Sequence, residues 1–300
     1  MSARSRNELF DEEFLARLQR LHLIAKRISV GGPAGGRRSR RIGDGLEFAD
    51  HRAYAPGDDI RFIDWPYYAR MEKLLLRLFH EHSEAEVFVA LDASASMAPG
   101  GSPAKFDYAR RTAAALAFVA MGSLERVAIV PFAEVAGEPL RTGRGRGRIF
   151  GVLDFLAGLR PAGRTDLPAV AEQLARRYTQ GGTLLVLSDL LDCADGLSDA
   201  LAQLRVTGWE VTVVHVVSPA DASPELDGPL LLQHAETGGR MSLAVSADVL
   251  ASYRKQWRRF CDGCERTCLS RGAVYVAAET SVPFETLVLR TLRRTGVLSG

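Results

Sequence analysis

The chain has 300 residues, of which 47% are hydrophobic and 25% charged, and its formal net charge is +2. This balance is typical of a soluble globular protein of one or two domains, and it argues against a protein whose overall charge attracts nucleic acid or a membrane surface. Four cysteines are too few for a disulfide scaffold, the first residues lack the apolar core of a signal peptide, and no apolar run approaches the roughly 18 residues of a membrane span. We therefore expect a cytoplasmic protein that has no membrane span and binds no nucleic acid.

The first part of the chain predicts a helix followed by a small separate segment. Apolar residues recur at helical spacing between residues 8 and 28, and the Gly31–Gly32–Pro33 sequence ends that pattern. We expect residues 1–34 to form a helix and a linker. Residues 35–84 carry the turn sequence PGDD and a group of aromatic residues, which predicts a small β-element.

From residue 85 onward, apolar runs alternate with helical patterns. Runs such as EVFVALD are apolar at nearly every position, which is typical of strands buried on both faces of a parallel sheet. The alternation predicts an α/β fold, a doubly wound and mostly parallel Rossmann-like sheet over residues 85–300. We expect strands at 86–92, 125–132, 183–189, 210–217 and 273–279, helices near 104–121, 148–158, 167–179, 196–206, 247–270 and 283–293, and a β-hairpin insert near 228–246.

Oxygen-bearing side chains follow three of these predicted elements. Ligands of open parallel sheets bind beyond the carboxyl ends of the strands, so these side chains are candidates for one site. Carboxylates and hydroxyls that converge in this way, with no neighbouring thiol or imidazole, suit a hard divalent cation. The alternative is that the first residues of the group only cap the next helix. The group comprises Asp92, Ser94 and Ser96 after the first strand, Thr165 and Asp166 in a later loop, and Ser188 and Asp189 at the end of a later strand.

The pattern resembles the metal-ion-dependent adhesion site of von Willebrand factor type A domains. DASAS, GRTDL and LVLSDLLD stand in the order of that family's motifs. The resemblance implies that the serines and the threonine bind the ion directly or through water, that the aspartates act mainly through water, and that a partner's carboxylate completes the shell. The implied ion is Mg²⁺, with Mn²⁺ or Ca²⁺ as alternatives. By resemblance, the ligands are Asp92, Ser94, Ser96, Thr165 and Asp189.

A second and more specific resemblance lies upstream. The segment RAYAPGDDIRFIDW is similar to the signature of the bacterial domain of unknown function 58 (DUF58), RxYxPGDDxRxIDW, and the likeness extends over roughly residues 35–295. Family members are commonly encoded beside MoxR-type AAA+ ATPases, which implies a non-enzymatic adaptor in chaperone-like maturation of other proteins, with that ATPase or another von Willebrand type A protein as partner. From the residues alone, a turn held by ion pairs is the simpler interpretation, and a docking surface is the functional one. The matched signature residues are Arg52, Tyr54, Pro56, Gly57, Asp58, Asp59, Arg61, Ile63, Asp64 and Trp65.

Three other interpretations compete with these. A metal-assisted hydrolase would use the same ion and would need Asp166 or Asp189 as general base. A purely structural scaffold would carry the motif without an ion. A zinc site formed by Cys261, Cys264 and Cys268 lacks a fourth ligand, because Cys193 is distant in sequence, so we expect these thiols to pack in the core. The basic stretches at 36–41 and 141–148 are interpreted as solvated loops or as docking segments for an acidic partner.

Overall fold

The computed structural model describes residues 6–31, 42–43, 47–56, 58–80, 86–98, 104–123, 125–143, 145–191 and 194–294, with the backbone alone for residues 7, 26–31, 42–43, 47–50, 78–80 and 194. The chain divides into two compact units. The larger unit combines Met1–Pro33 with Glu86–Gly300, and the smaller one is Ala34–Ala85. The N-terminal helical segment therefore belongs to the same unit as the α/β domain, although the sequence placed it in a region of its own.

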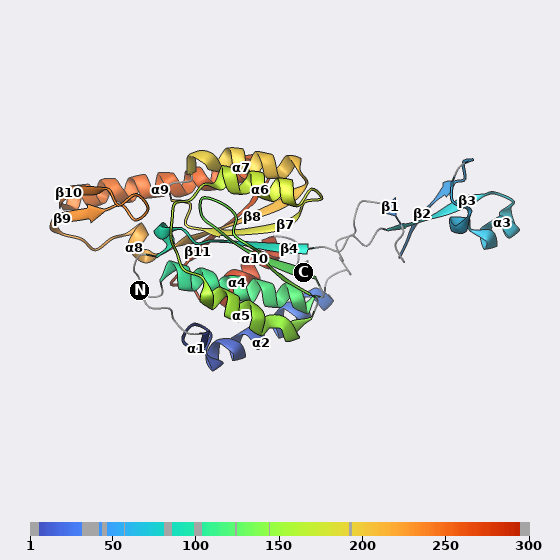
Figure 1. The fold of residues 1–300 in the computed structure, drawn as a ribbon, viewed down its shortest axis with the longest axis horizontal. Coiled ribbons are helices and arrows are strands. Elements are labelled where there is room, and N and C mark those ends of the chain that lie inside the picture. Colours follow the sequence, from blue (N-terminus) through green and yellow to red (C-terminus); the bar gives the residue numbers. More distant parts are fainter. Residues whose placement is uncertain are drawn as a thin grey trace. The chain divides into compact units, whose positions relative to one another are not determined.

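The core of the larger unit is a six-stranded sheet in the order β11-β8-β7-β4-β5-β6. Its strands β4, β7, β8 and β11 are labelled in Figure 1. All neighbouring strands are parallel except β6, which is antiparallel to β5 at the edge. The mostly parallel α/β fold expected from the alternation of strands and helices is thus confirmed, and β6 is an addition that the sequence did not predict. The strands are β4 (Glu86–Asp92), β5 (Arg126–Phe132), β6 (Leu140–Thr142), β7 (Gly182–Ser188), β8 (Trp209–Val217) and β11 (Val274–Glu279).

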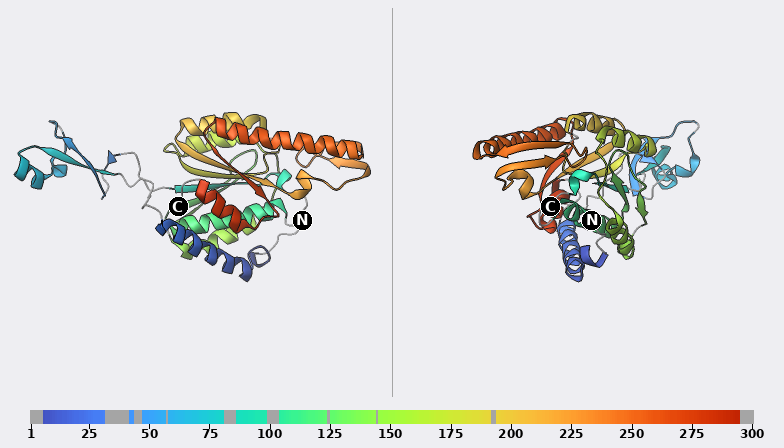
Figure 2. Two further views of the ribbon diagram at one scale, coloured as in Figure 1. Left: turned by 180° about the vertical axis from the view of Figure 1, so that it is seen from behind. Right: turned by 60° about the vertical axis from the view of Figure 1, so that its left-hand side comes forward.

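Helices cover both faces of this sheet (Figure 2). Consecutive residues of β4 alternate between two apolar clusters, since Val89 and Leu91 lie in one, and Phe88 and Ala90 in the other. This two-sided burial explains the unbroken apolar sequence of the strand. One cluster is closed by α4 (Lys105–Gly122), α5 (Ile149–Gly158), α10 (Phe284–Arg294), α1 (Arg6–Leu9) and α2 (Glu12–Gly31). The other is closed by α6 (Leu167–Arg177), α7 (Ala194–Val206) and α9 (Ala247–Ser270).

The helix α2 lies outside α4 and α10 as an additional layer. Its apolar residues Phe14, Leu18 and Leu21 are buried in the same cluster as α4. The rings of Phe14 and Phe284 are 5.0 Å apart, and Arg17 forms an ion pair with Glu285 on α10. The amphipathic pattern therefore predicted the helix, but its packing partner had to be seen in three dimensions.

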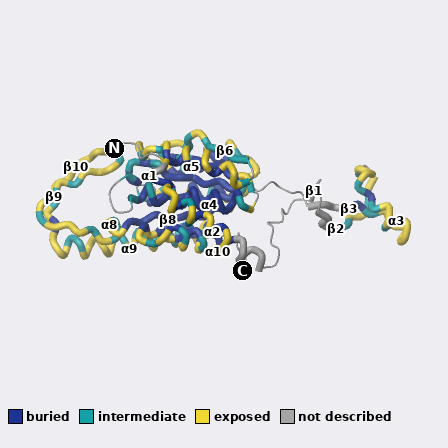
Figure 3. The backbone as a smooth tube through the Cα atoms, turned by 90° about the horizontal axis from the view of Figure 1, so that it is seen from below, coloured by how far each residue is buried: buried dark blue, intermediate teal, exposed yellow. Residues whose placement is uncertain are grey.

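The antiparallel hairpin of β9 (Gly228–Gln233) and β10 (Arg240–Val245) follows the short helix α8 (Pro219–Ala222) and precedes α9. Most of its residues are exposed, as are those of the first half of α9 (Figure 3). No helix of the described residues has the length and apolar content that crossing a membrane requires.

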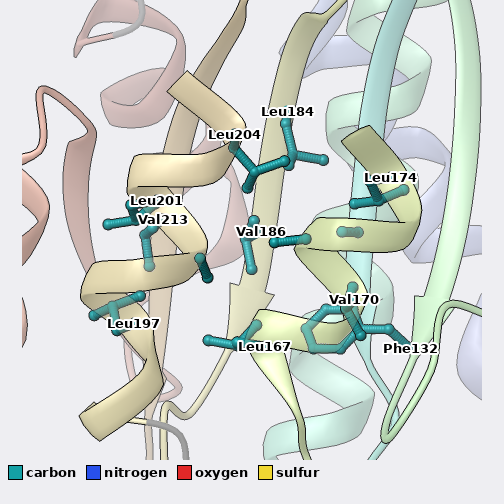
Figure 4. A pocket seen from close by; sticks show the side chains of 13 residues that line it. Phe132, Leu167, Val170, Leu174, Leu184, Val186, Leu197, Leu201, Leu204 and Val213 are labelled. Carbon is teal, nitrogen blue, oxygen red and sulfur yellow. The ribbon is translucent and has the colours of Figure 1, made fainter. Parts of the chain in front are cut away.

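A small apolar cavity of about 20 Å³ lies between the helix pair α6 and α7 and the sheet (Figure 4). Its lining residues are all apolar, among them Leu174, Val186, Leu201 and Val213. A polar ligand would find no hydrogen-bonding partner there, so the cavity is a packing defect of the core.

The smaller unit is a three-stranded sheet in the order β1-β3-β2, with one helix. Ile63 and Leu76 are buried and form a bridge between the turn and β3. Its elements are β1 (Ile42–Gly43), β2 (Glu47–Ala53), the 3-10 turn Ile60–Phe62, α3 (Trp65–Met71) and β3 (Leu75–His80).

Candidate metal centre

The carboxyl ends of β4 and β7 bring the first predicted ligands together. The two strands are neighbours, with Leu91 opposite Leu187, so Asp92 comes to lie beside Ser188 and Asp189. After Asp92 the chain stays extended through Ser94 and then turns into a short 3-10 segment, Ala95–Met97. The topological rule for parallel sheets thus accounts for the meeting of two segments that are almost a hundred residues apart.

A buried hydrogen-bond network joins four of the five predicted ligands. The Asp92 carboxylate accepts from the backbone N–H of Ser94 (2.9 Å) and from the hydroxyl of Ser188 (2.5 Å). The hydroxyls of Ser94 and Ser96 are 3.0 Å apart, and Ser96 donates to Oδ1 of Asp189 over 3.2 Å. All of these side chains are at most 4% exposed. The network gathers carboxylate and hydroxyl oxygens into one enclosed polar cluster.

Thr165 lies on a neighbouring loop that is bonded to the DASAS segment. The N–H of Ala162 donates to the carbonyl of Ala93 (2.7 Å), and the N–H of Ala95 donates to the carbonyl of Gly163 (3.0 Å). Thr165 itself uses its N–H and its hydroxyl to contact the carboxylate of Glu236, at 3.3 Å each. Glu236 is in the turn of the β9–β10 hairpin, and no sequence motif indicated this contact.

Asp92 is a buried carboxylate whose described hydrogen-bond partners are all neutral. Burial, together with the nearby Asp189 charge, raises the pKa of Asp92 to about 6, although its hydrogen bonds to Ser188 and Ser94 act in the opposite direction. A cation next to this oxygen-only cluster would relieve the unfavourable charge. Oxygen ligands are those that Mg²⁺ and Ca²⁺ prefer, so the residues present fit the expected ion.

A lysine that no sequence motif indicated completes the polar cluster. Lys105 stands in the first turn of α4 and is only 2% exposed. Its ammonium nitrogen is 2.7 Å from Oδ2 of Asp189 and 3.3 Å from Oδ2 of Asp221. Burial opposes the ammonium charge, but the two carboxylates outweigh it and raise the pKa of Lys105 above its usual value.

The imidazole nearest to this cluster is fully engaged in hydrogen bonds. Nε2 of His215 is 2.9 Å from the carbonyl oxygen of Asp189, and Nδ1 is 2.7 Å from the hydroxyl of Tyr275. A carbonyl can only accept, so Nε2 carries the hydrogen and Nδ1 accepts from the tyrosine. Burial lowers the pKa of His215 to about 4, so the ring is neutral near pH 7.

The two aspartates considered as general bases already have other tasks. Asp189 pairs with Lys105, and the Asp166 side chain caps α6 by accepting from the N–H of Ala169 (3.0 Å).

The signature segment is held by local ion pairs and caps. Asp58 accepts from Arg52 and from the N–H of Ala55, at 2.8 Å each, and the Arg52 contact foremost lowers the pKa of Asp58. Arg61 pairs with Asp59 (2.6 Å), and Asp64 accepts from His51 (2.9 Å). These contacts agree with the interpretation of a turn fixed by ion pairs.

Some of the remaining signature residues cap or bond the backbone, and Trp65 is exposed. Asp64 also caps α3 by accepting from the N–H of Tyr67, and Pro66 stands in the first turn of that helix. The N–H of Tyr54 donates to the carbonyl of Leu74, and Trp65 is 54% exposed. Gly57 lies outside the described residues.

The cysteines of α9 lie on the face that packs on the sheet. Cys264 and Cys268 are buried in the second apolar cluster, and Cys261 is partly buried. Among the described residues, no group of three or more His, Cys, Asp or Glu side chains is arranged to hold a metal. Cys193, the only other cysteine, lies outside them.

Comparison with known proteins identifies relatives over nearly the whole chain. The family model described as "Protein of unknown function DUF58" matches residues 50–260. Uncharacterized proteins of Mycobacterium tuberculosis and Mycobacterium bovis are 29% identical over 312 residues, covering 98% of this chain and 94% of each relative.

Solved structures show similarity in fold alone. An aerotolerance-related membrane protein of Bacteroides fragilis aligns with a TM-score of 0.48 and 18% identity, covering 71% of this chain and 99% of that structure. The conserved hypothetical protein BatB of Bacteroides thetaiotaomicron aligns with a TM-score of 0.46 and 16% identity, with the same coverage. The VWA domain of SpRpn10 aligns with a TM-score of 0.39 and 10% identity, covering 68% of this chain and 93% of that domain.

Proposed function

This chain belongs to the DUF58 family, and we propose that it is a non-enzymatic, metal-dependent protein-interaction module of the cytoplasm. In this proposal Asp92, Ser94, Ser96, Thr165 and Asp189 hold a divalent cation, with Mg²⁺ as the first choice. The ion would supply a coordination position for a carboxylate of the partner protein.

The burial of Asp92 among neutral hydrogen-bond donors is the observation that supports the proposal. Its carboxylate is fully buried, its described hydrogen bonds come from neutral groups, and the hydroxyls of Ser94 and Ser96 lie beside it in the network. A buried charge of this kind needs a cation or a proton for compensation. Hydroxyl ligands are neutral and leave much of an ion's charge available to an incoming anion.

The Glu236 contact supports a carboxylate as the group that is recognised. A carboxylate carried on a β-turn of this same chain already reaches both donors of Thr165. An acidic side chain of a partner would approach the same loop from outside, so Glu236 would compete with it.

For the partner we propose a MoxR-type AAA+ ATPase, or another von Willebrand type A protein, with a role in maturing client proteins. This part of the proposal rests on the family resemblance. The signature segment is the second candidate for docking because Ile60, Trp65 and Met71 are each more than half exposed in the smaller unit.

The geometry favours binding over hydrolysis. A metal-assisted hydrolase needs a group that takes a proton from water. Asp189 is paired with Lys105, Asp166 caps a helix, and His215 is buried with both nitrogens bonded.

The test is capture of the MoxR-type ATPase of the same organism by the immobilised full chain, in Mg²⁺ or in EDTA. We expect capture with Mg²⁺, loss in EDTA, loss with Asp92→Ala, and equal or stronger capture with Glu236→Ala. Asp262→Ala, which removes an exposed aspartate of α9, is the matched control and should behave as the unmodified chain. Capture that is insensitive to EDTA and to Asp92→Ala, but abolished by Trp65→Ala, would refute the metal-dependent mechanism and assign docking to the signature segment.

A further inference from the structure

We propose that Lys105 is a built-in counter-cation of the candidate metal centre, which limits how tightly the centre holds a divalent ion and keeps the bound ion attractive to a partner's carboxylate. This inference rests on the proposed function, because it concerns the same site. It assigns a task to a buried lysine that the adhesion-site resemblance does not include.

Lys105 contacts the carboxylate that borders the hydroxyl network. Its ammonium nitrogen is 2.7 Å from Oδ2 of Asp189, while Oδ1 of the same carboxylate accepts from the hydroxyl of Ser96. Asp189 therefore separates the lysine from the hydroxyl cluster by the width of one carboxylate. If an ion binds among the hydroxyls, it and the ammonium group of Lys105 will contact the same carboxylate, that of Asp189.

The cost of this arrangement is the second argument. An ammonium group at 2% exposure has lost nearly all of its hydration, and buried ion pairs contribute little to stability compared with apolar residues of similar volume. Apolar residues in place of both Lys105 and Asp189 would fill the same space without that cost, whereas methionine at position 105 alone would leave the buried Asp189 unpaired. A purely structural explanation therefore leaves the choice of an ion pair at this position unexplained.

The charge inventory is the third argument. The carboxylates of Asp92 and Asp189 lie in the hydroxyl network, and a third, that of Asp221, contacts Lys105. In the described part of the chain, Lys105 is the one cationic side chain in contact with any of the three. With Lys105 bound to Asp189, Asp92 is left as the uncompensated charge on the hydroxyl side. The charge of a divalent ion bound there would be larger than the negative charge of Asp92. The ion would therefore keep a net positive charge that an incoming carboxylate can neutralise.

Two consequences follow from Coulomb's law. The ammonium group repels the ion at short range in a poorly solvated site, so it lowers the affinity for the ion. The same surplus of positive charge strengthens the attraction of an incoming carboxylate. Asp221, whose side chain is 25% exposed, partly offsets the lysine from its outer side.

The experiment measures Mn²⁺ binding to the full chain by electron paramagnetic resonance, with Mn²⁺ alone as the probe. Lys105→Met should bind Mn²⁺ at least about tenfold more tightly than the unmodified chain, because the repelling charge is gone. Asp221→Asn keeps the capping hydrogen bonds of α8 but removes a negative charge, and it should weaken Mn²⁺ binding several-fold. Lys255→Met, on the exposed side of α9, is the matched control and should change nothing.

The possible outcomes separate this inference from the proposed function. Equal or weaker binding by a folded Lys105→Met variant, in a chain that binds Mn²⁺, overturns the inference and leaves the metal site in place. If Lys105→Met does not fold, an unchanged affinity of Asp221→Asn overturns it. Binding by Lys105→Met when the unmodified chain binds no Mn²⁺ supports the inference, since the repulsion by the lysine then lowers the affinity of the unmodified chain below detection. Absence of binding in both chains refutes the inference and the proposed metal dependence together.

Discussion

The hydroxyl of Ser188, the last residue of β7, donates to the carboxylate of Asp92, the last residue of β4, with 2.5 Å between Oγ and Oδ2. One oxygen of Asp92 is thus held by the neighbouring strand, and the second oxygen accepts from the N–H of Ser94. The orientation of the candidate ligand is set by neutral donors on two neighbouring segments.

Replacement of Ser188 should therefore lower the free energy of unfolding and raise the pKa of Asp92. Ser188→Ala leaves a buried acceptor unsatisfied, which costs about 2 kcal/mol of unfolding free energy for a bond to a charged group. The pKa of Asp92, already raised to about 6, should increase further because this hydrogen bond lowers it. Urea denaturation and NMR titration in EDTA measure the two effects. Ser242→Ala on the exposed face of β10 serves as control, and a Ser188→Ala loss no larger than that of the control would contradict the prediction.

The pH dependence of stability should contain two opposing contributions in metal-free buffer. The pKa of Asp92 is raised from 3.8 to about 6, so its contribution is complete below pH 4 and is lost, by about 3 kcal/mol, as the pH rises through 6. The pKa of His215 is lowered from 6.5 to about 4, so its contribution of about 3 kcal/mol is complete above pH 6.5 and is lost as the pH falls toward 4.

Substitution of either Asp92 or His215 should leave only the contribution of the other residue to the pH dependence of stability. Relative to the unmodified chain, Asp92→Asn should gain stability as the pH rises from 4 to 6.5, and His215→Gln should lose it over the same range. Denaturant unfolding at half-unit pH intervals measures both curves. Parallel curves for the unmodified chain and Asp92→Asn would contradict the raised pKa.

The thiols of α9 should differ in reactivity according to burial. Burial raises the pKa of Cys264 to about 11 and that of Cys268 to about 12, whereas Cys261 is only partly buried. The thiolate is the reactive form, so iodoacetamide at pH 8 should modify Cys261 at least about tenfold faster than the two buried thiols, which should react only after unfolding. Peptide mass spectrometry resolves the three sites. Equal protection of all three that is removed by a zinc chelator would instead support the zinc alternative.

The apolar cavity under α6 and α7 should accept one additional methylene group. Val213→Ile extends a side chain that lines this cavity, and it should raise the unfolding free energy by about 0.8 kcal/mol. Val214 is the neighbouring residue on the opposite face of β8, fully buried in the other apolar cluster and not part of the lining of this cavity, so Val214→Ile should be destabilising by about 1 kcal/mol or more. Thermal denaturation of the two variants compares them directly. Destabilisation by both substitutions to the same extent would show that the cavity cannot be filled.

Much of the fold could be predicted from local sequence because each central strand is apolar on both faces. Parallel strands present their carboxyl ends at one edge of a sheet, and this rule is sufficient to bring Asp92 near Asp189. Lys105 could not be placed in this way, since it is 84 residues from Asp189 and its helical pattern gave no sign of an inward-facing charge. Glu236 is 71 residues from Thr165 and stands on a hairpin turn that no sequence motif connects with the Thr165 loop. Strand β6 has three residues, Leu140–Thr142, too few for a periodic signal.

The most direct test of the proposed metal centre is a crystal structure of the full chain grown or soaked with Mn²⁺, with anomalous diffraction data that locate the ion. We predict one strong anomalous peak within bonding distance of the hydroxyls of Ser94 and Ser96, beside the carboxylates of Asp92 and Asp189, and loss of that peak in Asp92→Ala. An ordered site without such a peak at a saturating Mn²⁺ concentration, with Lys105 still bound to Asp189, would contradict it.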